Sequence, residues 1–192
     1  MNKIKISVLI ALGIVLFSCN KKSKEETTVI PEDVKVTLQK FATETKGVLG
    51  KNLMNAINTQ GTDKAIEFCS TKAIVLTDSM GGVFNATLKR VSDKPRNPLN
   101  RANGNETAFI KELKLKISKG EKMAPKFTES DGKVVGYFPI ETNAMCMQCH
   151  GSKDLDIKPN VLKKIVQFYP KDQATGYKEN QIRGIFVVTQ NN

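Results

Sequence analysis

Apolar residues recur in the first half of the chain with the spacing of two long α-helices. From Pro31 to about Asn58 they fall near one face of a helix, and Gly61 then interrupts the pattern. Thr62 is expected to cap a second helix, in which apolar positions recur at spacings of three, four and three residues. Cys69 is one of these positions, so the pattern predicts a thiol on the inward face of the second helix.

The rest of the chain alternates between strand and helix patterns. The predicted strands are 83–92, 126–129, 133–141 and 183–189, with an Asp131-Gly132 turn between the second and third. The predicted helices are 106–119, which has an exposed basic face, and 160–169. A polar loop is expected at 93–106, and no internal repeat is visible. The pattern predicts an α+β fold: an antiparallel sheet with flanking helices and long N-terminal helices.

The N-terminus has the pattern of an export signal. A short basic start precedes an apolar run, 6–17, which is too short to span a bilayer as a stable helix. Residues 16–19 resemble a bacterial lipobox, in which cleavage leaves Cys19 lipidated as the new N-terminus. An ordinary signal peptide with an incidental cysteine is the alternative. We expect a lipoprotein signal peptide at 1–18, a lipid-anchored tether at 19–30 and one folded domain at 31–192.

The net charge of the exported chain limits the classes of partner that we expect it to bind. The formal net charge is +11, and loss of Lys3 and Lys5 with the signal lowers it by two, to +9. This suits an acidic redox partner or a membrane surface. Nucleic acid is not expected, because bases and acids are interspersed and no recognition motif is present. Asn20 follows Cys19, where inner-membrane lipoproteins more often have aspartate, so the outer membrane, facing the periplasm, is favoured.

The run Cys146-Met147-Gln148-Cys149-His150 carries the candidate chemistry. C-x-x-C-H is typical of covalent c-type heme attachment: the two thiols add to the vinyl groups and the histidine ligates the iron. A thioredoxin-like dithiol would not need the histidine. A four-ligand zinc site cannot be completed, because His150 is the only histidine and the other cysteines are Cys19 and Cys69. The sequence predicts one covalent heme c, held by Cys146 and Cys149, with His150 as an iron ligand.

The second axial ligand has several candidates. The single histidine excludes bis-histidine ligation within one chain, which leaves Cys69, a methionine, a lysine or water. Cys69 is the first choice over a simple buried thiol, because it has no disulfide partner once the other cysteines are modified. The methionine candidates are Met54, Met80, Met123, Met145 and Met147, of which the last two flank the motif and are poorly placed to reach the far side.

The polar loop supplies two further candidate site residues. Arg96 is expected to pair with a heme propionate through its fork of donors, and the adjacent Asn97 to contribute to cofactor binding. A solvated surface loop is the alternative.

Four separated segments together resemble a known family. They are 65–73 around Cys69, 91–100 followed by Glu106, 146–151, and 182–186. Segments of this kind, in this order, characterise a bacterial family of c-heme domains with a PAS-like fold, which occur alone or at the sensory end of histidine kinases. The resemblance covers nearly all of the chain after the tether. It implies a histidine on one side of the iron and a cysteine thiolate on the other, here His150 and Cys69.

Three classes of function fit such a domain. The first expectation is a lipid-anchored, cytochrome-like protein that transfers single electrons or senses redox state. The second is a sensor of nitric oxide or carbon monoxide, which would need a partner to pass on its signal. The third, a peroxidase-type enzyme, is not expected, because it requires an open distal site with acid and base groups and the only histidine is already used.

Overall fold

A four-stranded antiparallel sheet lies at the centre of the computed structural model, which describes residues 29–191. The strands are β1 (Ala86–Val91), β2 (Lys126–Ser130), β3 (Lys133–Glu141) and β4 (Ile182–Gln190). The helices are α1 (Glu32–Gln60), α2 (Thr62–Phe84), the 3-10 turn η1 (Pro98–Asn100), α3 (Gly104–Ser118), α4 (Ala144–His150) and α5 (Pro159–Phe168). The strand order is β1-β4-β3-β2, so the last strand of the chain lies inside the sheet and joins its two halves.

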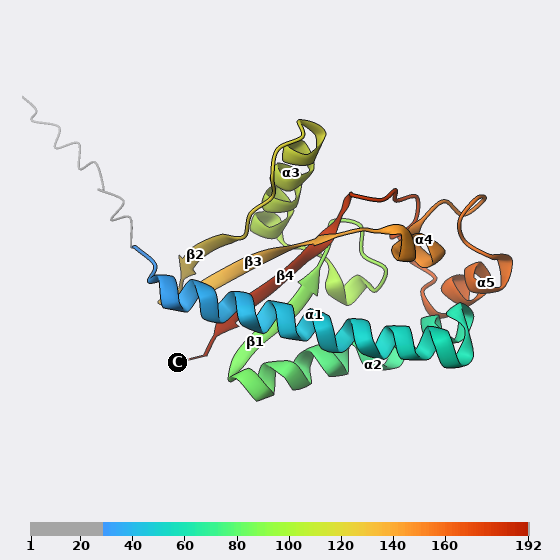
Figure 1. The fold of residues 1–192 in the computed structure, drawn as a ribbon, viewed down its shortest axis with the longest axis horizontal. Coiled ribbons are helices and arrows are strands. Elements are labelled where there is room, and N and C mark those ends of the chain that lie inside the picture. The colour runs from blue at the N-terminus through green and yellow to red at the C-terminus, as the bar shows by residue number, and fades with distance from the viewer. Residues whose placement is uncertain (1–28, 192) are drawn as a thin grey trace, which may run out of the picture.

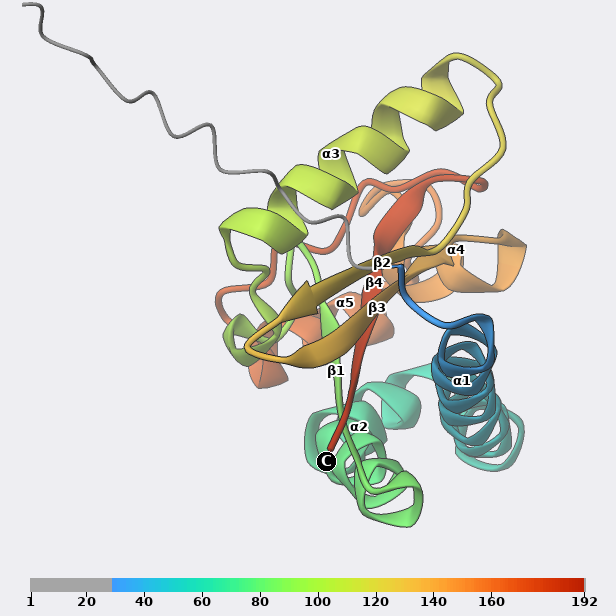
Figure 2. The same ribbon diagram turned by 90° about the vertical axis from the view of Figure 1, so that its left-hand side faces the viewer.

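Helices cover both faces of this sheet. The long helices α1 and α2 lie on one side, and α3 lies on the other (Figure 2). Successive residues of β4 show why both faces are apolar: Ile185 and Val187 join the core cluster beneath α3, whereas Phe186 and Val188 join the cluster beneath α1. Side chains of a strand alternate between faces, so a central strand covered on both sides is apolar at nearly every position.

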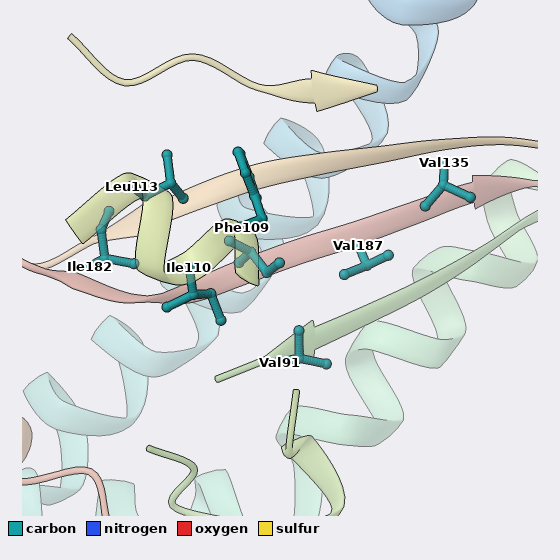
Figure 3. Close-up of a cluster of buried hydrophobic side chains, with 8 residues drawn as sticks. Val91, Phe109, Ile110, Leu113, Val135, Ile182 and Val187 are labelled. Carbon is teal, nitrogen blue, oxygen red and sulfur yellow. The ribbon is translucent and has the colours of Figure 1, made fainter. Parts of the chain in front are cut away.

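The cluster on the α3 side is formed by one helix and three strands (Figure 3). Its buried members are Val91, Phe109, Ile110, Leu113, Val135, Ile182, Ile185 and Val187. A capping box fixes the start of α3, since the Asn103 side chain accepts from the Glu106 backbone while the Glu106 carboxylate accepts from the Asn103 backbone. Lys89 of β1 also pairs with Glu106 at 2.6 Å, which ties the helix to the sheet.

The short helices α4 and α5 lie together at one end of the molecule, beside the adjoining ends of α1 and α2 (Figure 1). Helix α5 packs on α2 through a third apolar cluster, which includes Ile66 of α2 and Val161 and Ile165 of α5. Helix α4 also meets α2, where the Thr62 hydroxyl donates to the Gln148 side chain over 3.0 Å. The inward face of α2 is thereby directed toward the C-x-x-C-H motif.

The predicted α+β fold, with its antiparallel sheet and long N-terminal helices, is confirmed. Two local predictions were wrong. Residues 83 and 84 continue α2 instead of opening β1, and Gly61, not Thr62, is the cap residue of α2. The predicted signal peptide, most of the tether and the lipidation site Cys19 lie outside the described residues. Within residues 29–191, no helix combines the length and the apolar character needed to cross a membrane.

Candidate functional site

The C-x-x-C-H motif forms helix α4. Its start is fixed by Asn143, whose side-chain oxygen accepts a hydrogen bond from the Cys146 backbone over 3.3 Å. Residues three apart in a helix lie on the same face, so Cys146 and Cys149 project to one side. Neither forms a disulfide in the described structure, and Cys69 is also a free thiol. Both motif thiols therefore remain available for modification.

The imidazole of His150 is held by a main-chain carbonyl. Its Nδ1 lies 2.7 Å from the oxygen of Ala174, and because that oxygen can only accept, Nδ1 carries the proton. The side chain of Arg183 lies 3.4 Å from the same Nδ1, but two donors cannot share a hydrogen bond, so this contact is only one of proximity. The Tyr177 backbone donates to the His150 carbonyl over 2.9 Å. With Nδ1 occupied, Nε2 is the nitrogen left to bind a metal.

Arg96 connects its own loop to the end of α4 and to the segment 172–174. It donates from Nε to the Asp172 carboxylate over 3.2 Å, and from Nη2 to the carbonyl oxygens of Cys149 and, over 3.2 Å, Ala174. The Asp172 carboxylate also accepts from the Ala174 backbone over 2.8 Å. Arg96 is 8% exposed. Its guanidinium therefore fixes both the end of α4 and the carbonyl that orients His150.

The predicted site residues meet around one cavity of about 270 Å³. Its lining includes Cys69, Arg96, Asn97, Cys146, Cys149 and His150. Helix α2 supplies Cys69, the loop before η1 supplies Arg96 and Asn97, and α4 supplies the rest. Of the methionines in the described chain, Met145 alone lines the cavity, whereas Met123 packs against the core beneath α3.

Burial sets the protonation states of the candidate iron ligands. It lowers the pKa of His150 well below its usual range, and Arg96 and Arg183 act in the same direction against the hydrogen bond to Ala174. The imidazole is therefore neutral near pH 7, the form that can bind a metal. Burial raises the pKa of the Cys69 thiol, against the opposing effects of Arg90 and Arg96. It also raises the pKa of Cys149 to about 11. A metal would have to displace the proton of Cys69 to bind its sulfur.

The ionisable lining of the cavity is mainly positive. Arg90, Arg96 and Arg183 contribute three guanidinium groups, and Glu141 contributes one carboxylate. This charge pattern suits an anionic cofactor. A heme carries two carboxylates, and the free thiols on one face of α4 match its vinyl groups, so the residues present fit this group.

Some residues of this site had no predicted role. Asp172, Ala174 and Tyr177 come from a polar loop that carried no recognisable pattern. Arg90 occupies an inward-facing position of the predicted strand, and a charged residue at such a position is a signal that points to it. Arg183 belongs to one of the segments used for the family resemblance, but no role was assigned to it.

The fold and the site define an α+β protein in which a c-type heme attachment motif borders a basic cavity. A family model described as Tll0287-like matches residues 20–191, and the chain belongs to this family.

The fold is similar to the crystal structure of the cyanobacterial heme-protein Tll0287, with a TM-score of 0.59 and 20% sequence identity. The match covers 83% of this chain and 96% of that one, which agrees with the family assignment. None of the curated proteins searched gave a match.

Proposed function

We propose that this protein is a c-type cytochrome of the bacterial cell envelope that transfers single electrons or senses redox state. One observation carries the proposal: Cys69, Cys146, Cys149 and His150, from two separate helices, line the same cavity. The similarity to a heme-protein of the same fold supports it. A bound heme would supply an iron that takes up and releases one electron.

Four side chains of the cavity would hold this cofactor. Cys146 and Cys149 would attach the heme through thioether bonds. His150 would bind the iron through Nε2, in an orientation fixed by the Ala174 carbonyl. Cys69 of α2, which lines the same cavity, would supply a thiolate as a further iron ligand. A thiolate donates strongly to ferric iron, so the reduction potential should lie well below that of a histidine/methionine cytochrome.

Location and partners form part of the same proposal. A lipid on Cys19 would tether the domain to the outer membrane, and the net charge of +9 that remains after loss of Lys3 and Lys5 favours an acidic redox partner. Labelling with palmitate tests the anchor: the wild type should be labelled and Cys19→Ala should not. A mature protein that is never labelled in its native host would contradict the anchor without affecting the heme site.

Covalent attachment is tested on denatured protein. Heme should remain with the polypeptide after boiling in detergent, at one per chain, because thioether bonds are covalent. A Cys146→Ala/Cys149→Ala variant should lose it. Heme that extracts from the wild type into acidified organic solvent would contradict a c-type protein.

The second axial ligand is tested with Cys69→Ala. This variant should keep its covalent heme, change to a high-spin or water-ligated ferric spectrum, and show a higher reduction potential. Met145→Leu is the matched control, because it changes the one described methionine that lines the cavity and should leave the spectrum unchanged. If the Met145 variant changes the spectrum and the Cys69 variant does not, the sulfur that binds the iron belongs to Met145 and not to Cys69.

A further inference from the structure

Arg90 occupies a position of β1 where the fold requires an inward-facing side chain. Ala86 and Leu88, four and two residues before it, are both buried in the core beneath α1. Side chains two residues apart in a strand share a face, so Arg90 projects toward the same side of the sheet. Its neighbour Lys89 points the other way and pairs with Glu106 of α3. A guanidinium thus continues an apolar row into the interior.

At this position Arg90 lines the cavity, and its Nε is fully buried without a hydrogen-bond partner among residues 29–191. No other described residue accepts a hydrogen bond from its side chain. Arginine stays charged, and a buried cation without an anion is destabilising. Native proteins leave few such groups unsatisfied, so this donor indicates a missing acceptor.

The other two arginines of the cavity already donate hydrogen bonds to acceptors of the protein. Arg96 is used by Asp172 and two main-chain carbonyls. Arg183 donates to the Lys94 carbonyl over 3.3 Å and lies over the Tyr177 ring. Glu141 also lines the cavity but forms no ion pair with Arg90 in the described structure. Of the three arginines, Arg90 alone has no acceptor.

We propose that Arg90 binds a heme propionate. The inference rests on the proposed heme site but not on the direction or purpose of electron flow. A planar guanidinium matches a carboxylate in fork geometry, and a cation beside it would keep a propionate charged inside the cavity. The thiolate of Cys69 is the competing acceptor, since it lines the same cavity and Arg90 acts to lower the pKa of this thiol. An iron-bound thiolate, however, is already compensated by the metal.

The test uses the intact heme-loaded protein and Arg90→Gln, with Arg101→Gln as the matched control. Arg101 lies outside the cavity lining and is exposed, so its loss removes the same charge from the surface. Arg90→Gln should shift the propionate bending band in the resonance Raman spectrum and lower the reduction potential, because the unpaired carboxylate favours ferric iron. Arg101→Gln should change neither. If Arg90→Gln fails to accumulate, Arg90→Lys should still shift the band, because an ammonium cannot form the fork.

A double-mutant cycle with Cys69→Ala separates the two acceptors. If Arg90 binds a propionate, Arg90→Gln lowers the potential by a similar amount with or without Cys69. If the shift disappears in the Cys69→Ala background, Arg90 acts through the thiolate and the inference is overturned. An unchanged Raman band in a variant with full covalent heme overturns it as well, and leaves the proposed function intact. A wild type without covalent heme instead contradicts the proposed function itself.

Discussion

Breaking the buried ion pair between Arg96 and Asp172 at one partner should be strongly destabilising, and this gives a quantitative test. The Arg96 side chain is 10% exposed and the Asp172 side chain 7%. Arg96→Met would keep most of the apolar stem but remove the donor to Asp172 and to the carbonyls of Cys149 and Ala174. The variant would therefore leave the buried Asp172 carboxylate without its cation, and the carbonyl oxygens of Cys149 and Ala174 without the guanidinium that donates to them.

The expected loss follows from the burial of the pair. Removing one partner of a buried ion pair leaves an uncompensated charge and costs about 3–5 kcal/mol. In a domain of this size each 1 kcal/mol lowers Tm by about 2–4 °C, so Tm should fall by roughly 6–20 °C. The double variant Arg96→Met/Asp172→Leu removes both charges and should recover more than half of that loss, because no charge is left unpaired.

Guanidinium chloride unfolding followed by far-UV circular dichroism measures these free energies on the heme-loaded protein. Arg101→Met, on an exposed side chain, is the control and should stay within about 0.5 kcal/mol of the wild type. The reasoning is refuted if Arg96→Met costs less than about 1 kcal/mol, or if the double variant is no more stable than the single one.

Three further predictions concern other parts of the fold. Gly184→Ala should cost about 1–3 kcal/mol, because its Cβ would overlap the Val91 carbonyl oxygen, whereas Gly104→Ala, with nothing within 4 Å, should be nearly neutral; chemical denaturation compares the two. Glu106→Ala should lower the unfolding free energy by about 2–3 kcal/mol and Glu106→Gln by about half that, since glutamine keeps the cap but not the ion pair. Burial raises the pKa of Tyr169 to about 12, above its usual 10, so unfolding releases this proton between those pH values. The unfolding free energy should therefore fall as pH rises through this window. In Tyr169→Phe, which lacks the titrating phenol, this fall should be smaller by roughly 1–2 kcal/mol.

Periodicity located most elements because most have one clear apolar face. The hairpin β2–β3 was predicted with its turn, and Asp131 and Gly132 both adopt the positive φ that the turn requires. The boundary between α2 and β1 was not found. Residues 83 and 84 are apolar and fit either element, and the helix ends only at Asn85, which adopts the left-handed conformation.

The residues that line the cavity were largely predictable, including Arg96 and Asn97 of the polar loop. C-x-x-C-H identified three residues, and the unpaired thiol singled out Cys69, all of which line the cavity. The contacts that hold the motif in place were not predictable. Asp172 and Ala174 act through contacts with residues more than 20 positions earlier in the chain, and no local pattern reports such contacts.

The acceptor for His150 is a main-chain atom, and this affects how the site responds to mutation. Every residue type at position 174 would bring a carbonyl, so no side-chain exchange there deletes the hydrogen bond itself. Exchanges that displace the segment are the ones that can misalign the imidazole, and the segment is held by Asp172 and Arg96. The orientation of the His150 imidazole therefore depends on this distant pair, and exchanges at Asp172 or Arg96 should misalign it although neither residue touches the ring.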